Sequence, residues 1–229
     1  NGNFFSPRSA EAGSFYIRNQ STQTMSSGYV SQYVDLAAND ELTINCERES
    51  STSSGYVGIY MWHLSNSTKY SSFMDIEKIT DPVITCTANQ TTQRPNKGSW
   101  SIIDFSPNHT SNEYNGTGFF TLQNGGIKVN SSGIYIISTN IALFNNSTAR
   151  TNIFIKFFKN SESIYGTACS NYIRDSSSHE RSSSYLSRTV ELDANDIIYV
   201  KSQREAAGND NTNLILSSQR SILEMRKIS

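Results

Sequence analysis

The sequence has little charge, little cysteine and little histidine for its 229 residues. Asp, Glu, Lys and Arg make up 17% of the chain, and the formal net charge is −1. Because there is no basic excess to neutralise phosphates, a nucleic-acid partner is not expected. The three histidines, His63, His109 and His179, are far apart and lack metal-ligand spacing, which argues against a zinc site. These shortages favour a protein without a metal or any other cofactor.

Long apolar runs are also missing. No run approaches the roughly 18 residues that cross a bilayer, and the N-terminal stretch NGNFFSPRSAEAG lacks the charged-then-apolar pattern of a signal peptide. Asn-x-Ser/Thr sequons, which accept glycans in exported proteins, are frequent instead. They could arise by chance in a chain rich in Asn, Ser and Thr, but their number favours a secreted protein or the ectodomain of a single-pass membrane protein. They begin at Asn19, Asn66, Asn89, Asn108, Asn115, Asn130, Asn145 and Asn146.

The hydrophobic pattern predicts strands. Helical periodicity is almost absent, and short runs rich in Val, Ile, Tyr, Phe and Thr alternate with Gly, Asn, Ser and Asp, as in an all-β sandwich or barrel. A polar stretch that ends near Gly98 indicates a domain boundary. Strands are expected at 14–18, 30–36, 41–47, 57–64, 74–79 and 83–88 before this boundary. After it they are expected at 100–105, 118–122, 126–129, 133–144, 152–158, 163–168, 185–192, 197–202 and 221–228.

In the first part, Cys46, Trp62 and Cys86 follow one another at the ends or centres of predicted strands. With the lead-in LAANDELTINC, this order resembles an immunoglobulin-like domain. The resemblance implies a disulfide between Cys46 and Cys86, with the tryptophan packed on it. Closing a loop of that length stabilises a domain by roughly 3–4 kcal/mol in the chain-entropy model. Another small β-sandwich with a coincidental tryptophan is the alternative.

The second part carries more specific motifs. The segments GTGFFTLQNGGIKVNSSGIYIISTNIALF and RTVELDANDIIYVKSQ, with a last strand at SSQRSILEMRKIS, resemble the tumour necrosis factor (TNF) and complement component 1q globular-head superfamily. Gly133 and Tyr135 match the entry to the family's long strand, and Asn195 stands where the family has a glycine. Asparagine is suitable there because it adopts the left-handed region. The other matching residues are Leu192, Asp196, Ile198, Val200 and Trp100.

The expected fold class is therefore all-β, an immunoglobulin-like β-sandwich followed by a TNF-like jelly-roll β-sandwich. The domains are residues 1–92 and 100–229, with a linker at 93–99. The resemblance further implies a homotrimer, because members of the superfamily assemble around a threefold axis and bury sheet area. An intrachain core is the alternative for each candidate interface residue. The candidates are Tyr135, Ile137, Tyr199, Ile222 and Leu223.

Receptors of such ligands dock on loops between protomers, which here correspond to residues 106–117 and 172–184. The second loop offers exposed charge for steering and docking, although a merely solvated loop would look the same. Its candidate receptor-binding residues are Arg174, Asp175, His179, Glu180 and Arg181. A glycan on Asn108 or Asn115 would count against the first loop.

These features fit two classes of function and argue against a third. The favoured one is a TNF-like ligand ectodomain that trimerises and binds a cell-surface receptor. The alternative is an immune recognition or adhesion protein, like the complement head, that binds glycans or surface proteins. An enzyme, and with it a small-molecule substrate, is not expected, because no nucleophile elbow, carboxylate pair or metal motif is present. Cys169 is expected to be buried and unpaired rather than bonded to a neighbouring chain.

Overall fold

The computed structural model describes residues 36–41, 76–88, 95–105, 111–114, 118–144, 151–173, 181–205 and 221–229. The chain divides into two compact units, one made of residues 1–33 and 81–229 and the other of residues 34–80. In the smaller unit the described residues include a turn, in which the Asp40 N–H bonds the Ala37 carbonyl at 3.2 Å and Asn39 has a φ of 73°. Residues 76–88 of the predicted immunoglobulin-like domain are described as well, and its other residues, with Cys46 and Trp62, lie outside the described residues.

The described part of the larger unit consists of strands and turns. No helix in the described ranges is long and apolar enough to cross a membrane. The strands are β1 (Val83–Thr87), β2 (Asn96–Lys97), β3 (Ser101–Ile102), β4 (Ser111–Tyr114), β5 (Phe120–Gln123), β6 (Gly126–Val129), β7 (Gly133–Phe144), β8 (Thr151–Lys159), β9 (Glu162–Ile173), β10 (Arg181–Leu192), β11 (Ile197–Arg204) and β12 (Ile222–Lys227).

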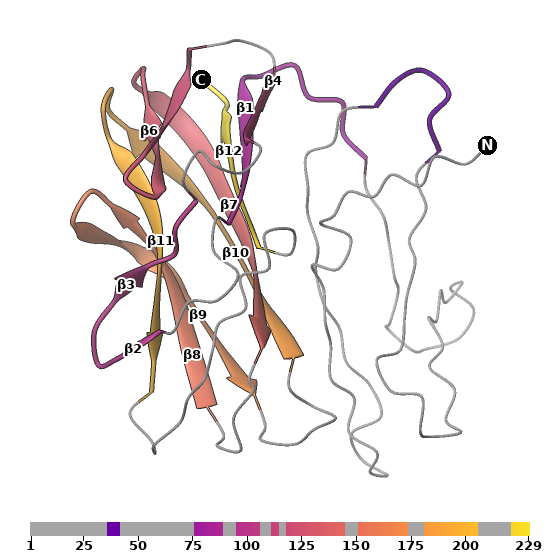
Figure 1. The fold of residues 1–229 in the computed structure, drawn as a ribbon. Helices are drawn as coiled ribbons and strands as arrows, with labels where there is room; N and C mark the ends of the chain where they lie inside the picture. The colour runs from indigo at the N-terminus through magenta and orange to yellow at the C-terminus, as the bar shows by residue number, and fades with distance from the viewer. Residues whose placement is uncertain are drawn as a thin grey trace, which may run out of the picture. The chain divides into compact units, whose positions relative to one another are not determined.

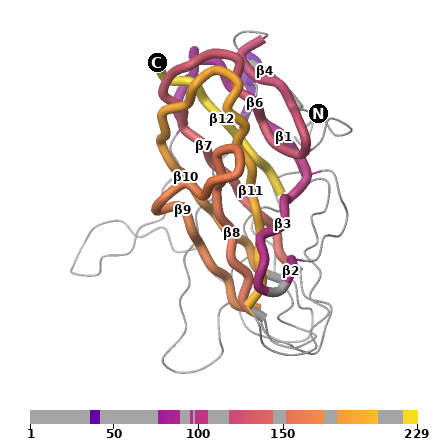
Figure 2. The backbone as a smooth tube through the Cα atoms, turned by 90° about the vertical axis from the view of Figure 1, so that its left-hand side faces the viewer, coloured from indigo at the N-terminus to yellow at the C-terminus, as the bar shows by residue number. Residues whose placement is uncertain are grey.

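Two sheets form a sandwich (Figure 1). The first, in the order β10-β7-β12-β1-β4, is called the β7 sheet below, and the second, in the order β5-β6-β11-β8-β9, is called the β11 sheet. β2 and β3 extend the second sheet by pairing with the end of β11 (Figure 2). Neighbouring strands in each sheet are mostly far apart in sequence, which is jelly-roll connectivity. The all-β sandwich expected from the sequence is confirmed for this part of the chain.

Alternation along the strands builds the core between the sheets. In β7, Tyr135, Ile137, Ile141 and Leu143 are buried in the core cluster, while Ile134 is exposed. β8 and β11 contribute in the same way, so that side chains two residues apart share a face. The core cluster also includes Ile84, Cys86, Phe105, Ile127, Ile153, Ile155, Phe157, Ile198, Val200, Leu223 and Met225.

Asparagine and glycine set the turns. Asn124 and Gly125 have φ of 53° and 82°, as a two-residue hairpin between β5 and β6 requires. Asn195, with a φ of 76°, confirms the expected left-handed residue before β11. At Gly133, an added Cβ would lie 2.1 Å from the Ser229 carbonyl oxygen, so only glycine lets the C-terminal residue pass.

Asp196 ties this last turn to the β8–β9 hairpin. Its carboxylate accepts a bond from the Asp193 N–H at 2.9 Å, one from the Asn160 amide at 2.8 Å and an ion pair from Lys159 at 3.5 Å. Burial acts to raise the pKa of the Asp196 carboxyl, but these hydrogen bonds and the lysine charge outweigh burial and hold the pKa below its usual value.

The first strand of the sandwich differs from its expected assignment. Val83–Thr87 was expected to end the first domain, but β1 pairs with β12 on one side and β4 on the other, ahead of the expected linker at 93–99. Cys86 lies opposite Leu223 in this pairing and is a free, buried cysteine, which differs from the expected disulfide with Cys46. The reason is the phase of β1, which turns Cys86 into the sandwich core.

Candidate functional site

The five residues expected at the trimer interface do not share one surface. Tyr135, Ile137 and Leu223 belong to the core between the sheets, which corrects their expected role, since a side chain in the intrachain core cannot meet another protomer. Ile222 is buried and pairs with Asn140 of β7, on the face of the sheet opposite to that of Leu223. Tyr199 lies on the outer face of the other sheet, opposite Phe158. Alternation along the strands correctly predicted that these side chains are buried. It did not predict which of them face the core between the sheets and which lie on an outer face.

The reverse face of the β7 sheet holds a buried polar cluster. Glu224 is 1% exposed, and its carboxylate accepts bonds from Ser138 Oγ at 3.2 Å and from Thr85 Oγ1 at 3.4 Å. Burial first, and then the charge of Glu224, raise the pKa of the Cys86 thiol far above that of a free cysteine. Cys86 is therefore a packed, protonated side chain rather than a reactive one.

The expected receptor-binding residues Arg174, Asp175, His179 and Glu180 lie outside the described residues, and Arg181 begins β10. Within the expected first loop, residues 111–114 form β4. The glycosylation sites lie outside the described residues apart from Asn130, which is exposed. The Asn130 Nδ2 donates to the Gly118 carbonyl at 2.7 Å and lies 3.1 Å from Thr121 Oγ1. These expectations remain predictions.

An irregularity in the β8–β9 hairpin gives the most distinctive exposed residue of the described chain. Lys156 pairs with Ala168 and Phe158 with Ser163, so the four residues 164–167 of β9 lie opposite the single residue Phe157. Such a bulge changes the direction in which side chains leave the sheet. The residue that it displays is Tyr165, which is 93% exposed.

The bulge is held in place from within. Thr167 is fully buried, and its Oγ1 donates to the Ile164 carbonyl at 2.6 Å. Ile164 itself packs against the core. Gly166 has a φ of 72°, a conformation that glycine adopts without strain. The two residues that flank the Tyr165–Gly166 pair are thus anchored, while the tyrosine ring stands in solvent.

A docking role is consistent with this geometry. Burying an aromatic ring is strongly favourable, and tyrosine is enriched among the residues that dominate protein–protein binding energy. A large exposed aromatic on an anchored segment loses little conformational entropy when a partner covers it. Tyr172, which is 56% exposed on a regular part of the same strand, provides a comparison without a bulge.

The sequence alone did not single out Tyr165 as a candidate, although it contains a local signal for a bulge there. The segment ESIYGTAC has a glycine inside a predicted strand, which is typical of a bulge or a close backbone approach. Periodicity alone could not show whether Tyr165 faces solvent, because the extra residues shift the phase of the strand by an amount that pairing decides.

Cys169, which follows the bulge, forms no disulfide within this chain and is half-buried; that it forms no bond to a neighbouring chain stays a prediction. Burial raises the pKa of this thiol, and hydrogen bonds from Ser184 and from the Ile155 backbone partly offset the rise. Next to it, the Asn171 amide donates to Ser184 Oγ and to the Ser183 carbonyl of β10. Polar contacts therefore close this edge of the sandwich between β9 and β10. Among the described residues, no group of three or more His, Cys, Asp and Glu side chains could hold a metal ion.

Comparisons with known proteins gave structural matches alone. No protein-family model matches the sequence, and no curated protein matches it. Crystal structures of murine APRIL are similar to the chain: one at pH 8.0, with 17% identity and a TM-score of 0.45, covers 64% of this chain and 98% of APRIL. One at pH 5.0, with 18% identity and a TM-score of 0.45, covers 65% and 99%. One at pH 8.5, with 16% identity and a TM-score of 0.45, covers 64% and 98%.

Proposed function

We propose that this chain is the extracellular part of a TNF-like ligand, which assembles as a homotrimer and binds a cell-surface receptor protein without catalysing a reaction. The sequence resemblance over Gly133, Tyr135, Leu192 and Asp196 supports the family, and the jelly-roll connectivity of the two sheets is consistent with it. The sequons support an extracellular location, either secreted or tethered to a membrane. Fold alone does not specify function, so the receptor role depends on a site.

Tyr165 is the observation that carries the receptor role. This aromatic side chain is 93% exposed. The bulge beneath it is held by a buried threonine, Thr167, whose hydroxyl donates to the Ile164 carbonyl. An exposed tyrosine on a backbone segment anchored at both sides is suited to insert into a complementary pocket on a protein partner. The receptor-docking surface is therefore assigned to the bulge at residues 164–167.

Assembly into a trimer needs a surface other than the core residues. With Tyr135, Ile137 and Leu223 inside the sandwich, the apolar side chains that remain for self-association lie on other faces, such as Ile134, which is 40% exposed. Light scattering on the chain with its glycans trimmed tests the assembly directly. A mass of three chains is expected, and a strict monomer at micromolar concentration would rule out the trimer.

Receptor binding is tested by presenting the chain to cells that each express one receptor from a panel, and then measuring affinity for any receptor found. We expect Tyr165→Ala to weaken binding by about 2 kcal/mol or more, as at an interface hot spot. Its thermal stability should not change, because the side chain is exposed.

Tyr172→Ala is the matched control, since it removes an exposed tyrosine from the regular part of the same strand. Its affinity should stay close to that of the unmodified chain. Equal losses for the two variants, or no loss for Tyr165→Ala, would show that the bulge is not the docking site. Binding to glycan surfaces but to no receptor protein would favour the recognition alternative.

A further inference from the structure

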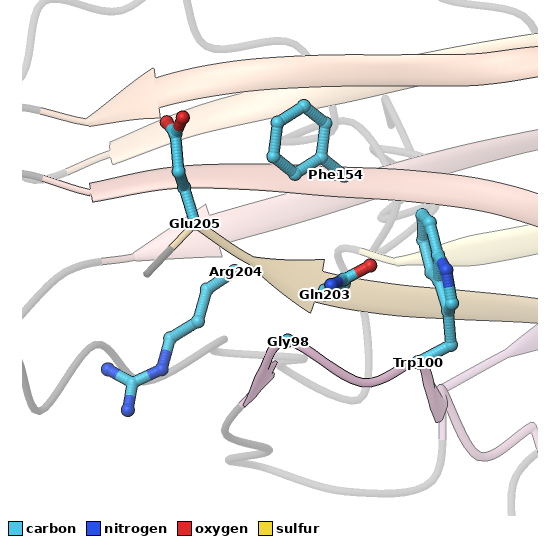
Figure 3. Close-up of a pocket in the computed structure, with 6 residues that line it drawn as sticks. All are labelled: Gly98, Trp100, Phe154, Gln203, Arg204 and Glu205. Carbon is cyan, nitrogen blue, oxygen red and sulfur yellow. The ribbon is translucent and has the colours of Figure 1, made fainter. Parts of the chain in front are cut away.

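A shallow pocket of about 360 Å³ lies on the outer face of the β11 sheet, at the end distant from the β8–β9 turn. It is formed where residues 98–100, just before β3, lie beside the first residues of β8 and the last residues of β11. The lining residues are Gly98, Trp100, Phe154, Gln203, Arg204 and Glu205 (Figure 3). Two aromatic rings thus share one small depression with amide and carboxylate groups, and the proposed receptor site makes no use of it.

The aromatic wall is held in place. The Trp100 ring packs on Phe158, with centroids 5.5 Å apart and the planes at 60°. The Lys201 ammonium also contacts Phe158, 4.2 Å from the centroid of its ring. A ring fixed by such contacts offers a preorganised face and loses little freedom when a ligand covers it.

The polar groups come from the end of β11. Gln203 pairs with Phe154 across the sheet, so both side chains leave the outer face, and Glu205 follows two residues later on the same face. The Glu205 carboxylate accepts a hydrogen bond from the Asn152 Nδ2 at 3.3 Å. The backbone N–H of Glu205 donates to the Asn152 carbonyl at 2.9 Å. Figure 3 shows the Arg204 side chain pointing away from Phe154 and Glu205.

We propose that this pocket binds one pyranose ring of an uncharged glycan. The C–H groups on one face of a sugar ring pack against the negative face of an aromatic ring such as Trp100. The hydroxyls around the ring can donate to the Glu205 carboxylate and exchange both kinds of bond with the Gln203 amide.

Charge argues against the other ligand that combines aromatic rings with a carboxylate, an organic cation. Lys156 and Lys201 pair with each other across β8 and β11, two residues from Phe154 and Gln203 on the same outer face. Their positive field opposes a cation at the pocket. A neutral sugar avoids that repulsion and still uses the carboxylate.

The test uses the whole chain, stripped of its own N-glycans and labelled with ¹⁵N in the tryptophan indoles. The chain has two tryptophans, Trp62 and Trp100, and Trp100→Phe assigns their resonances. The probes are methyl glycosides of glucose, mannose, galactose, fucose and N-acetylglucosamine, titrated into the millimolar range that suits a single sugar unit. At least one glycoside should shift the Trp100 signal saturably and leave Trp62 unmoved.

Glu205→Gln and Gln203→Ala should each weaken that binding about tenfold, the usual effect of losing a hydrogen bond to a charged or well-placed group. Both residues are at least partly exposed, so melting temperature should not fall. Thr121→Val, at an exposed position on β5 at the far edge of the same sheet, should bind as the unmodified chain does. A silent Trp100 signal with every glycoside, or a shift with tetramethylammonium instead, would overturn the proposal.

Discussion

Replacing Thr167 with valine tests how the bulge beneath Tyr165 is held. The Thr167 hydroxyl donates to the Ile164 carbonyl at 2.6 Å, and the side chain is fully buried. Valine has nearly the same shape, so the change removes the hydrogen bond and creates almost no cavity. A net loss of about 1–2 kcal/mol is expected, because the bond itself is lost and the Ile164 carbonyl becomes harder to satisfy.

For a chain of this size, that loss lowers the melting temperature by about 2–8 °C. Denaturant unfolding and a thermal melt measure it, and Thr121→Val is the control. Thr121 Oγ1 also makes a hydrogen bond, to the Asn130 side chain at 3.2 Å, but at an exposed site, so its loss should stay within about 0.5 kcal/mol.

The same variant connects stability to binding. If Thr167 holds Tyr165 in its docking geometry, Thr167→Val weakens receptor affinity, although by less than Tyr165→Ala, because the ring is still present. Equal stabilities for Thr167→Val and the unmodified chain would show that the hydrogen bond from Thr167 to Ile164 does not stabilise the bulge.

Three further outcomes are expected. Gly126→Ala would place a Cβ 2.5 Å from the Ile198 carbonyl oxygen and should destabilise the sandwich by about 1–3 kcal/mol; an unchanged unfolding midpoint would contradict this. The lowered pKa of Asp196 means that its ionised form stabilises the fold above the ordinary carboxyl pKa, and that this stability is lost as pH falls through the lowered folded value. Asp196→Asn should therefore flatten the stability–pH curve below about pH 4. An unchanged curve would show that Asp196 does not contribute to the pH dependence of stability. Cys86, whose raised pKa follows first from burial, should resist iodoacetamide at pH 8 until the chain unfolds, as peptide mapping can show; rapid labelling of the native chain would count against a packed thiol.

Most strands of the sandwich could be predicted from local pattern. The expected ranges 126–129 and 133–144 match β6 and β7 in full, and those for β8, β10, β11 and β12 differ by a few residues at their ends. Strong alternation and Asn-Gly turns specify such segments locally. β2 and β4 were missed, because short polar strands owe their existence to partners that are distant in sequence.

The candidate sites depended far more on pairing. Tyr165 and Tyr172 lie on the same strand, but the bulge exposes the first much more than the second. Trp100 was noted because it resembles a family aromatic, whereas its neighbours in the pocket, Phe154 and Glu205, carried no local signal. They come from separate strands that only sheet register brings together.

By itself, the amino-acid sequence determined that this chain forms many short strands, turns at its Asn and Gly residues, and buries apolar side chains of β7, β11 and β12. These properties are local, because they follow from side-chain shape and backbone freedom within a few residues. Tertiary structure alone decided that β1 belongs to the sandwich, that Tyr135, Ile137 and Leu223 face the core, and that a bulge lifts Tyr165 into solvent. Each of these depends on which distant strand supplies the partner and in what register, and a shift of one residue exchanges the two faces of a strand.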